Sequence, residues 1–457
     1  MSAVAILLKE MGWQVTGSDS NFYPPVSTYL EQSGIRFFKG YRPENIPPDI
    51  ETIVIGKHAE LTPELNEEVR AALALKMPIK SFAEVLGEVT NNRENIVIAG
   101  SYGKSTCTAI MAWCLEYAGK KPGYFIGAIP ITPSTSSAAG TGKQFIIEGD
   151  EYPSANWDDS SKFLHYHPSH LLLTSLAHDH INIFKTVADY RAPFQKLISL
   201  VPPEGLIVAC ADGGGITHTL AELDRPAILY SVHNMTCPWH VEHVTYGEET
   251  TFDIIHDGHP IVSITTELLG LHNIENILGV GTFLLTQNLV TPQEFSDAIR
   301  QFKPPQRRLN KMSDTTRIPA YEGFGSSRDK AISAISAMKL HYPSRKLIVL
   351  FEPHTFSWRT REALPWYDTV FSQADRVLIY KPSLHGAQSD QLQLEEIVTQ
   401  VNNHGTNAVG FESPTEGNKI FKNSITDDSV VLILSSGGFD GMIDDVKKFL
   451  EQTFPNQ

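Results

Sequence analysis

Short runs of aliphatic and β-branched residues alternate along this chain with stretches whose apolar positions recur every three or four residues. Continuous apolar runs are typical of strands buried on both faces, and the second spacing is typical of amphipathic helices. The predicted strands are 13–19, 52–56, 96–99, 144–148, 171–174, 206–210, 346–351, 376–380 and 429–435. The predicted helices include 1–10, 63–75, 109–115 and 187–199, and residues 250–265 have the pattern of an antiparallel pair. This alternation predicts an α/β fold built on parallel sheets.

Two polar or proline-containing segments divide the chain. Residues 91–95 precede the strand at 96–99, and Lys303-Pro304-Pro305-Gln306 marks a second boundary. Together with a length of 457 residues, they predict three domains, 1–90, 91–310 and 311–457. Doubly wound nucleotide-binding domains begin with a strand and a glycine-rich loop, whereas this chain begins in the helix that should follow them. Either the first domain has a different fold or its start is missing.

The composition narrows the class of protein. A net charge of −15 argues against a general nucleic-acid-binding protein, because such a protein needs a basic surface. No apolar run is long enough to cross a bilayer, so we expect no membrane insertion. The four cysteines form no Cys-x-x-Cys pair, which favours a reducing, cytoplasmic setting.

The most specific local signal is the segment Gly100-Ser101-Tyr102-Gly103-Lys104-Ser105-Thr106, between the strand 96–99 and a helical pattern. Backbone N–H groups and the helix dipole at such a turn attract phosphate, and the lysine adds a positive charge. The serine hydroxyl is suited to the Mg²⁺ that accompanies a nucleoside triphosphate. The longer phosphate-loop pattern has another glycine where this chain has Ile98. The segment predicts binding of ATP and Mg²⁺, and a glycine turn with an exposed lysine is the alternative.

Three carboxylates, Glu148, Asp150 and Glu151, lie where the strand 144–148 ends. Bringing them together is unfavourable unless a cation is near, so they favour a magnesium site beside the triphosphate. A solvated acidic turn is the alternative.

Five histidines lie between residues 165 and 180. They would suit a zinc or two-metal hydrolase, although that function would leave the phosphate loop unexplained. For His165 and His167 we prefer positions on a half-exposed strand. The triplet His178-Asp179-His180 follows the strand 171–174, which places it at the same sheet edge as the phosphate loop.

Four motifs of this chain match those of a known family and occur in the same order. The loop at 100–106 resembles the Gly-Thr-His-Gly-Lys-Thr-Thr loop of the Mur ligases, the ATP-dependent amide-forming enzymes of peptidoglycan synthesis. The other matching segments are Gly270-Leu271-His272-Asn273-Ile274-Glu275-Asn276, Arg307-Arg308 and Ser435-Ser436-Gly437-Gly438-Phe439. The resemblance spans nearly the whole chain. It implies a Rossmann-like UDP-sugar-binding domain, a central P-loop ATPase-like domain and a C-terminal Rossmann-like domain that binds an amino acid or peptide.

Within the family, segments 148–152, 162–166 and 352–357 resemble the murein peptide ligase branch, as do Gly17-Ser18-Asp19 and Tyr23-Pro24-Pro25. That resemblance implies a ligase of peptidoglycan recycling, which joins the tripeptide L-alanyl-γ-D-glutamyl-meso-diaminopimelate to UDP-N-acetylmuramate through an acyl phosphate. One alternative is a UDP-N-acetylmuramate–L-alanine ligase. Another is a degenerate family member that binds nucleotide without ligase activity.

Matching positions imply roles for individual residues. Lys104 would hold the β- and γ-phosphates, and Arg308 would reach the γ-phosphate. Ser105, Glu148 and His180 would ligate magnesium. The implied catalytic residues are Lys104, Glu148, His180 and Arg308. The implied nucleotide contacts are Gly100, Ser101, Tyr102, Gly103, Lys104, Ser105, Thr106, Asn276 (at adenine), Arg308 and Glu322, and the implied substrate contacts are Ser18, Asp19 and His354.

Three departures from the family pattern bear on activity. The opening strand and glycine loop, which help to bind the UDP-sugar diphosphate, are absent before Met1, as a mis-called start or a truncation would explain. Tyr102 stands at the usual histidine of the phosphate loop. Glu322-Gly323-Phe324-Gly325-Ser326-Ser327 replaces an Asp-Asp-Phe-Ala-His motif, so that one carboxylate is kept and Ser326 takes the histidine position.

Overall fold

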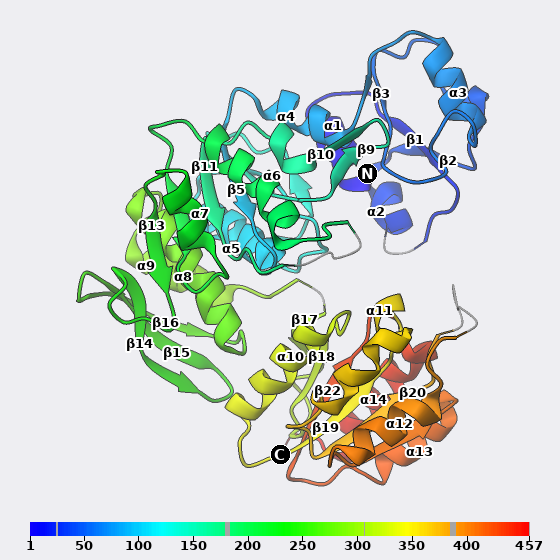
Figure 1. The fold of residues 1–457 in the computed structure, drawn as a ribbon, viewed down its shortest axis with the longest axis vertical. Coiled ribbons are helices and arrows are strands. Elements are labelled where there is room, and N and C mark those ends of the chain that lie inside the picture. The colour runs from blue at the N-terminus through cyan, green and yellow to red at the C-terminus, as the bar shows by residue number, and fades with distance from the viewer. Residues whose placement is uncertain (24–25, 179–182, 306, 384–389, 457) are drawn as a thin grey trace. The chain divides into compact units, whose positions relative to one another are not determined.

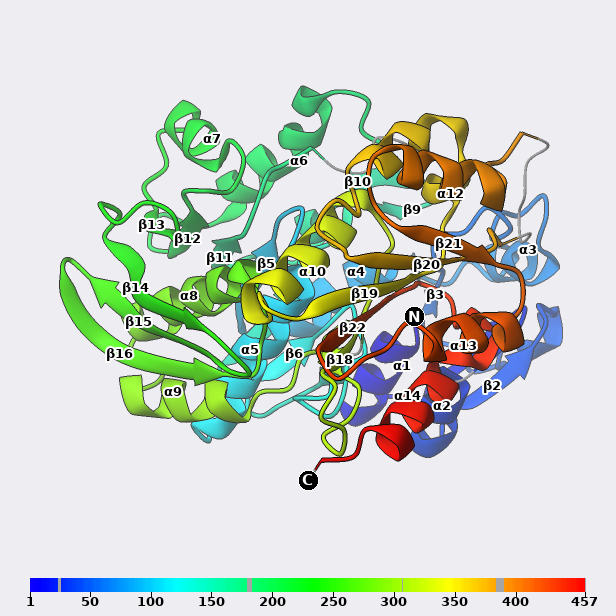
Figure 2. The same cartoon turned by 90° about the horizontal axis from the view of Figure 1, so that it is seen from below.

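The computed structural model describes residues 1–23, 26–178, 183–305, 307–383 and 390–456 (Figure 1, Figure 2). It contains two compact units. The first comprises Met1–His243, Phe252–Ile264 and Glu275–Phe302, and the second comprises Val244–Thr251, Thr265–Ile274 and Lys303–Gln457. Among the described residues, no helix has the length and apolar character that a membrane crossing requires.

The first 90 residues form small helices and two short pairs of parallel strands, β1–β2 and β3–β4. The elements are α1 (Ser2–Glu10), β1 (Thr16–Asp19), α2 (Val26–Ser33), β2 (Arg36–Lys39), η1 (Pro43–Asn45), β3 (Ile53–Val54), α3 (Glu67–Ala74), β4 (Ile79–Lys80) and α4 (Phe82–Thr90). Strand β1 begins later than predicted. The N–H groups of Gly12 and Trp13 bond the carbonyls of Lys9 and Leu8, so these residues close helix α1 instead.

A ten-stranded sheet, most of which belongs to the first unit, has the order β16-β15-β14-β13-β12-β11-β5-β8-β6-β7. Its strands are β5 (Glu94–Ala99), β6 (Gly123–Phe125), β7 (Ser137–Ala138), β8 (Gln144–Glu148), β11 (His170–Leu173), β12 (Ile207–Cys210), β13 (Ile228–Ser231), β14 (Trp239–Tyr246), β15 (Thr250–His256) and β16 (His259–Thr266). Neighbouring strands from β6 to β14 are parallel. The continuous apolar runs therefore correctly predicted buried parallel strands.

The outer strands of this sheet include the expected antiparallel pair. Strands β15 and β16 are neighbours joined only by Asp257 and Gly258, whose φ angles are +49° and +74°. Two consecutive positive φ values are typical of the tight turn of a β-hairpin. The prediction for 250–265 is thus confirmed.

Helices pack against this sheet in the first unit (Figure 1). They are α5 (Lys104–Tyr117), α6 (Val187–Leu200), α7 (Ile216–Glu222), α8 (Leu271–Thr286) and α9 (Pro292–Gln301). Thr186 caps α6 by accepting a hydrogen bond from the N–H of Asp189, which fixes the start predicted at residue 187. Helix α5 contacts α9, where the Trp113 indole donates to the Ala298 carbonyl at 2.8 Å. This contact helps to fix the helix that follows the phosphate loop.

Two local predictions are wrong. The polar segment 91–95 is not wholly a linker, because Glu94 and Asn95 belong to β5. Asn95 is only 1% exposed, and its amide nitrogen donates to Thr90 Oγ1 at 3.0 Å and to the Tyr166 carbonyl at 2.8 Å. These two hydrogen bonds offset part of the cost of burying the side chain. His165 and His167 do not lie on a strand. His165 ends the 3₁₀ helix η2 (Lys162–His165), and His167 turns the chain with a φ of +45°.

The second unit is built on a six-stranded sheet, in the order β17-β18-β22-β19-β20-β21. The strands are β17 (Arg308–Lys311), β18 (Ala320–Gly323), β19 (Lys346–Phe351), β20 (Arg376–Tyr380), β21 (Ala408–Phe411) and β22 (Ser429–Leu434). Only β17 runs antiparallel to its neighbour. Strands β19 and β20 have the bounds that the sequence predicts.

Alternate residues of these strands point to opposite faces, and each face has its own helices (Figure 2). The helices are α10 (Arg328–His341), α11 (Phe356–Arg359), α12 (Leu394–Asn403), α13 (Pro414–Lys422) and α14 (Met442–Thr453). Leu347 and Val349 pack in one apolar cluster with α10 and α12. Ile348 and Leu350 pack in another with α13 and α14. Helices on both faces are the arrangement of a doubly wound domain.

Candidate active site

The phosphate loop joins the end of β5 to the start of α5, as predicted. Gly100 has a φ of +144° and Gly103 a φ of +81°, and Gly103 is the N-cap of α5. A Cβ at Gly100 would lie 2.3 Å from Thr174 Oγ1, and one at Gly103 would lie 2.4 Å from Asn276 Oδ1. Both the backbone conformation and the lack of space therefore require glycine at these two positions.

Residues between and after these glycines are held by the segment that follows strand β11 and by helix α6. The Ser101 N–H donates to the Ser175 carbonyl at 2.9 Å, and the Tyr190 hydroxyl donates to Ser101 Oγ at 2.9 Å. The Thr174 hydroxyl donates to the Tyr102 carbonyl. Thr106 is buried in the first turn of α5. The loop thus has a fixed backbone before any ligand binds, which favours preorganised anion binding.

Lys104 pairs with a carboxylate from a neighbouring loop. Its Nζ lies 3.1 Å from Glu151 Oε2 and also donates to the Gly100 carbonyl. Glu151 is only 1% exposed, so its charge is compensated largely within the protein. The lysine occupies a position from which a bound phosphate could take over its contacts.

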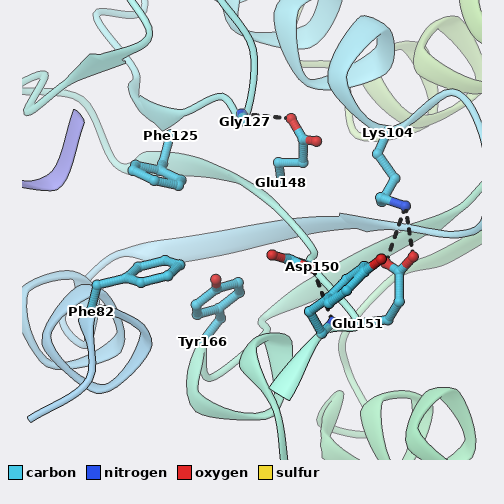
Figure 3. A pocket seen from close by; sticks show the side chains of 9 residues that line it. Phe82, Lys104, Phe125, Gly127, Glu148, Asp150, Glu151 and Tyr166 are labelled. Carbon is cyan, nitrogen blue, oxygen red and sulfur yellow. Dashed lines mark hydrogen bonds and ion pairs between the residues drawn. The ribbon is translucent and has the colours of Figure 1, made fainter. Parts of the chain in front are cut away.

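Ser105 and Glu148 meet beside this lysine. The Ser105 hydroxyl donates to Glu148 Oε1 at 2.7 Å, and the Gly127 N–H donates to Glu148 Oε2 at 2.7 Å. The Gly127 contact fixes the carboxylate so that it faces the first turn of α5 (Figure 3). A hydroxyl and a carboxylate oxygen at this separation suit Mg²⁺, which prefers oxygen ligands and retains several waters.

A pocket of about 270 Å³ lies next to these groups (Figure 3). It is lined by Phe82, Lys104, Phe125, Gly127, Glu148, Asp150, Glu151, Tyr152 and Tyr166. Its charged side is rich in carboxylates, and Asp150 forms an ion pair with Lys162 at 2.6 Å. Its other side is aromatic. Such a pocket suits a ligand that is polar at one end and apolar at the other.

Of two further residues predicted to contact the metal or the nucleotide, the structure describes one. His180 lies outside the described residues. Asn276, on α8, is 5% exposed, and its Oδ1 lies 3.3 Å from Cys107 Sγ on α5. Together with its closeness to Gly103, this contact places Asn276 directly behind the loop.

The predicted substrate residues Ser18 and Asp19 lie together at the end of β1. The Ser18 hydroxyl donates to the Glu68 carboxylate, which also accepts from the Arg42 N–H at 2.7 Å. Asp19 accepts a 3.2 Å hydrogen bond from the Tyr41 hydroxyl. Both residues are thus at the carboxyl end of a strand, the edge where ligands collect in such sheets.

The remaining predicted residues belong to the second unit. Glu322 lies on β18 and forms an ion pair with Arg307 Nε at 3.0 Å, next to Arg308 at the start of β17. Burial raises the pKa of Glu322, and Arg307 partly offsets that effect. His354 follows β19, and its Nδ1 lies 3.3 Å from Ser436 Oγ in the loop after β22.

That loop reveals a residue that sequence reasoning did not single out as a site residue. Glu352 is only 6% exposed and accepts hydrogen bonds from the Ser435 hydroxyl and, at 3.2 Å, from the Phe439 N–H. A Cβ at Gly437 would lie 2.6 Å from the Glu352 carboxylate. Glu352 therefore shapes the glycine-rich turn, and its place at the end of a buried strand was the available signal.

A second group of polar side chains lies in the first unit and was also missed. Cys210, Asp212 and Glu275 have potential ligand atoms within 4.8 Å of one another. Burial raises the pKa of Glu275 to about 7. Asp212 already accepts hydrogen bonds from the Ser231 hydroxyl at 2.8 Å and the Val232 N–H at 2.9 Å. Because these residues lie far apart in the sequence, no short sequence motif contains all three.

Comparison with known proteins agrees with this architecture. Residues 1–94 match the model described as Mur ligase family, catalytic domain, and residues 98–284 match the Mur ligase middle domain. A UDP-N-acetylmuramate–L-alanyl-γ-D-glutamyl-meso-2,6-diaminoheptandioate ligase of Escherichia coli (strain K12) is 27% identical over 97% of this chain and 94% of its own length.

Solved structures show the same fold. One is the UDP-N-acetylmuramate:L-alanyl-γ-D-glutamyl-meso-diaminopimelate ligase from Neisseria meningitides. It is 31% identical to this chain, with a TM-score of 0.61 over 67% of this chain and 96% of that one. The UDP-N-acetylmuramate–alanine ligase of Thermotoga maritima has a TM-score of 0.77 over 99% of this chain and 97% of that one, at 20% identity. The predicted three-domain α/β fold is thereby confirmed. This chain belongs to the Mur ligase family, whose members are ATP-dependent amide-bond-forming ligases.

Proposed function

We propose that this chain joins L-alanyl-γ-D-glutamyl-meso-diaminopimelate to the carboxylate of UDP-N-acetylmuramate, using ATP. The observation that carries the proposal is the meeting of Ser105 and Glu148 at 2.7 Å beside Lys104, at the wall of a pocket. The murein peptide ligases among its relatives support the choice of substrates. The four cysteines are free and buried, which is consistent with work in the reducing cytoplasm.

In this proposal the reaction proceeds through an acyl phosphate. The carboxylate attacks the γ-phosphorus of ATP and displaces ADP, which forms the acyl phosphate. The peptide amine then attacks the acyl carbonyl, loses a proton to solvent and expels inorganic phosphate. Lys104 leaves Glu151 and binds the β- and γ-phosphates, while the loop N–H groups hold the remaining phosphate oxygens. Ser105 and Glu148 would hold Mg²⁺, which when bound offsets the charge of the phosphates. The protein contributes position and electrostatic stabilisation more than covalent chemistry.

The other assigned residues complete the proposed site. His180 would supply a further magnesium ligand, and Asn276 would contact adenine. Arg308 would stabilise the γ-phosphate during transfer, because its charge is permanent and its fork matches phosphate oxygens. The remaining proposed contacts are Gly100, Ser101, Tyr102, Gly103, Thr106 and Glu322 for the nucleotide, and Ser18, Asp19 and His354 for the substrates.

A second candidate amine is L-alanine. A UDP-N-acetylmuramate–L-alanine ligase of Psychrobacter arcticus is also 27% identical, over 83% of this chain. Both candidate reactions use the same acceptor, so the loop and the pocket do not distinguish them.

The test is phosphate release from ATP and UDP-N-acetylmuramate, measured with the tripeptide, with L-alanine and with no amine. Release that depends on the tripeptide supports the proposal. Release that depends on L-alanine favours the second candidate. Nucleotide binding without amine-dependent release contradicts both and supports a binding protein without ligase activity.

A further inference from the structure

Tyr166 lies at the wall of the pocket, and a hydrogen bond fixes its backbone. The residue follows η2, and its own carbonyl accepts the 2.8 Å hydrogen bond from the Asn95 amide in β5. The side chain is fully buried. Among the described residues its hydroxyl has no hydrogen-bond partner.

A buried hydroxyl without a partner is costly, at about 1–3 kcal/mol, and folded proteins contain few of them. A phenylalanine would fill the same space without this cost. The presence of a hydroxyl at this position therefore indicates that a partner binds to it in the folded protein.

The direction of the ring shows where such a partner would lie. In Figure 3 the hydroxyl points into the pocket, between the aromatic rings of Phe82 and Phe125 and the carboxylate of Asp150. Asp150 itself is engaged by Lys162 at 2.6 Å and by the Tyr152 N–H at 3.0 Å. The hydroxyl is thus aimed at the space that a ligand would fill.

The electrostatic surroundings keep the Tyr166 hydroxyl protonated, so that it can donate a hydrogen bond. Burial raises the pKa of Tyr166 well above its ordinary value, and the charges of Asp150 and Glu148 raise it further. The phenol therefore keeps its proton over the whole physiological pH range. A neutral O–H can attract an anionic oxygen into a pocket whose acidic residues would repel it.

We propose that the Tyr166 hydroxyl donates a hydrogen bond to the carboxylate of the acceptor substrate and holds it near the phosphate that Lys104 binds. This inference rests on the proposed ligase function and adds a substrate-contacting residue to it. The hydroxyl is closed to water in the present structure, so neighbouring side chains must shift slightly when the carboxylate enters. The carboxylate then supplies the missing partner.

The test is the variant Tyr166→Phe, with Tyr230→Phe as the matched control. Tyr230 is also fully buried, and its hydroxyl has no nitrogen or oxygen partner among the described residues. It contacts the Cys210 thiol instead, and it does not line this pocket. For each protein we would measure kcat and KM for UDP-N-acetylmuramate, the Kd for ATP and the thermal midpoint of unfolding.

We expect Tyr166→Phe to lower kcat/KM for UDP-N-acetylmuramate about 10- to 100-fold, as for loss of a hydrogen bond to a charged group. The Kd for ATP should stay within twofold, and the thermal midpoint should be unchanged or higher. Tyr230→Phe should keep wild-type kinetics; because it also loses a contact with the Cys210 thiol, it is a control for kinetics and not for stability. The inference is overturned by wild-type kinetics in Tyr166→Phe, or by an activity loss that parallels losses of stability and ATP affinity. If the wild-type protein itself shows no acceptor-dependent turnover, the proposed function fails instead.

Discussion

The Ser105 hydroxyl donates a 2.7 Å hydrogen bond to the Glu148 carboxylate, although 43 positions separate the two residues in the chain. The pairing of β5 with β8 makes this possible, because parallel neighbours end at the same edge of the sheet. The hydroxyl belongs to the first turn of α5, and the carboxylate lies at the end of β8. This relationship joins the phosphate loop to the proposed magnesium site.

Replacing Glu148 by glutamine should weaken magnesium binding specifically. The amide oxygen can still accept the Ser105 hydrogen bond, but the negative charge is lost. We expect the Mg²⁺ concentration for half-maximal turnover to rise about tenfold or more, with partial rescue by excess Mg²⁺. Asp159→Asn, which alters an exposed carboxylate on β10 (Asp158–Ser161), is the control. An unchanged Mg²⁺ dependence in Glu148→Gln would remove this residue from the metal site.

Removing the Lys104 charge should abolish turnover and also reduce stability. Lys104→Met leaves Glu151 buried without its cation, an effect of about 3 kcal/mol or more for a buried pair. The double variant Lys104→Met/Glu151→Gln should regain stability but not turnover. Thermal unfolding and phosphate release separate the two effects. Near-normal turnover in either variant would contradict the role of Lys104 in binding the triphosphate.

Arg308→Ala should lower kcat more than it weakens ATP binding, because the proposed contact strengthens as charge moves to the transferred phosphate. Arg308→Lys keeps the charge without the fork, and we expect it to fall between wild type and alanine. Turnover and the Kd for ATP would be measured on the same preparations. Equal losses in both quantities would reduce Arg308 to a ground-state contact.

Glu275 should make the protein less stable as pH rises. Burial raises its pKa to about 7 in the folded protein, against 4.5 as the ordinary value. Between these values the folded state binds more protons than the unfolded state, so stability falls with increasing pH, by at most about 3 kcal/mol. Glu275→Gln should lack this loss. Urea unfolding from pH 4.5 to pH 8 checks the difference, and identical pH profiles would contradict the assignment.

Local sequence patterns predicted the parts of the fold that local forces determine. Strands β19 and β20 were predicted with correct bounds, because their apolar runs end abruptly in polar residues. The position of the phosphate loop between a strand and a helix was also predicted, since its glycines, its lysine and the start of the helix are contiguous in the sequence. The segment 91–95 was misread because the partners that make Asn95 suitable for a buried strand are residues 90 and 166.

Tertiary contacts determined the rest. The pairing of Lys104 with Glu151 depends on how β5 and β8 align, which no short motif encodes. That the Tyr166 hydroxyl lacks a hydrogen-bond partner among the described residues can be seen only in the folded structure. Likewise, residues 244–251 include parts of two strands of the ten-stranded sheet, and residues 265–274 include the end of β16 and the start of α8. Both segments nevertheless belong to the second compact unit. Composition changes at 91–95 and 303–306 could not reveal that division.

The most direct test of the central claim is the fate of the acceptor's carboxylate oxygens. UDP-N-acetylmuramate labelled with ¹⁸O in its carboxylate would be incubated with ATP and the tripeptide, and the released phosphate would be analysed by mass spectrometry. Activation through an acyl phosphate predicts one ¹⁸O atom in each phosphate formed with product. Unlabelled phosphate would show that water attacks ATP, and would contradict carboxylate activation by this chain.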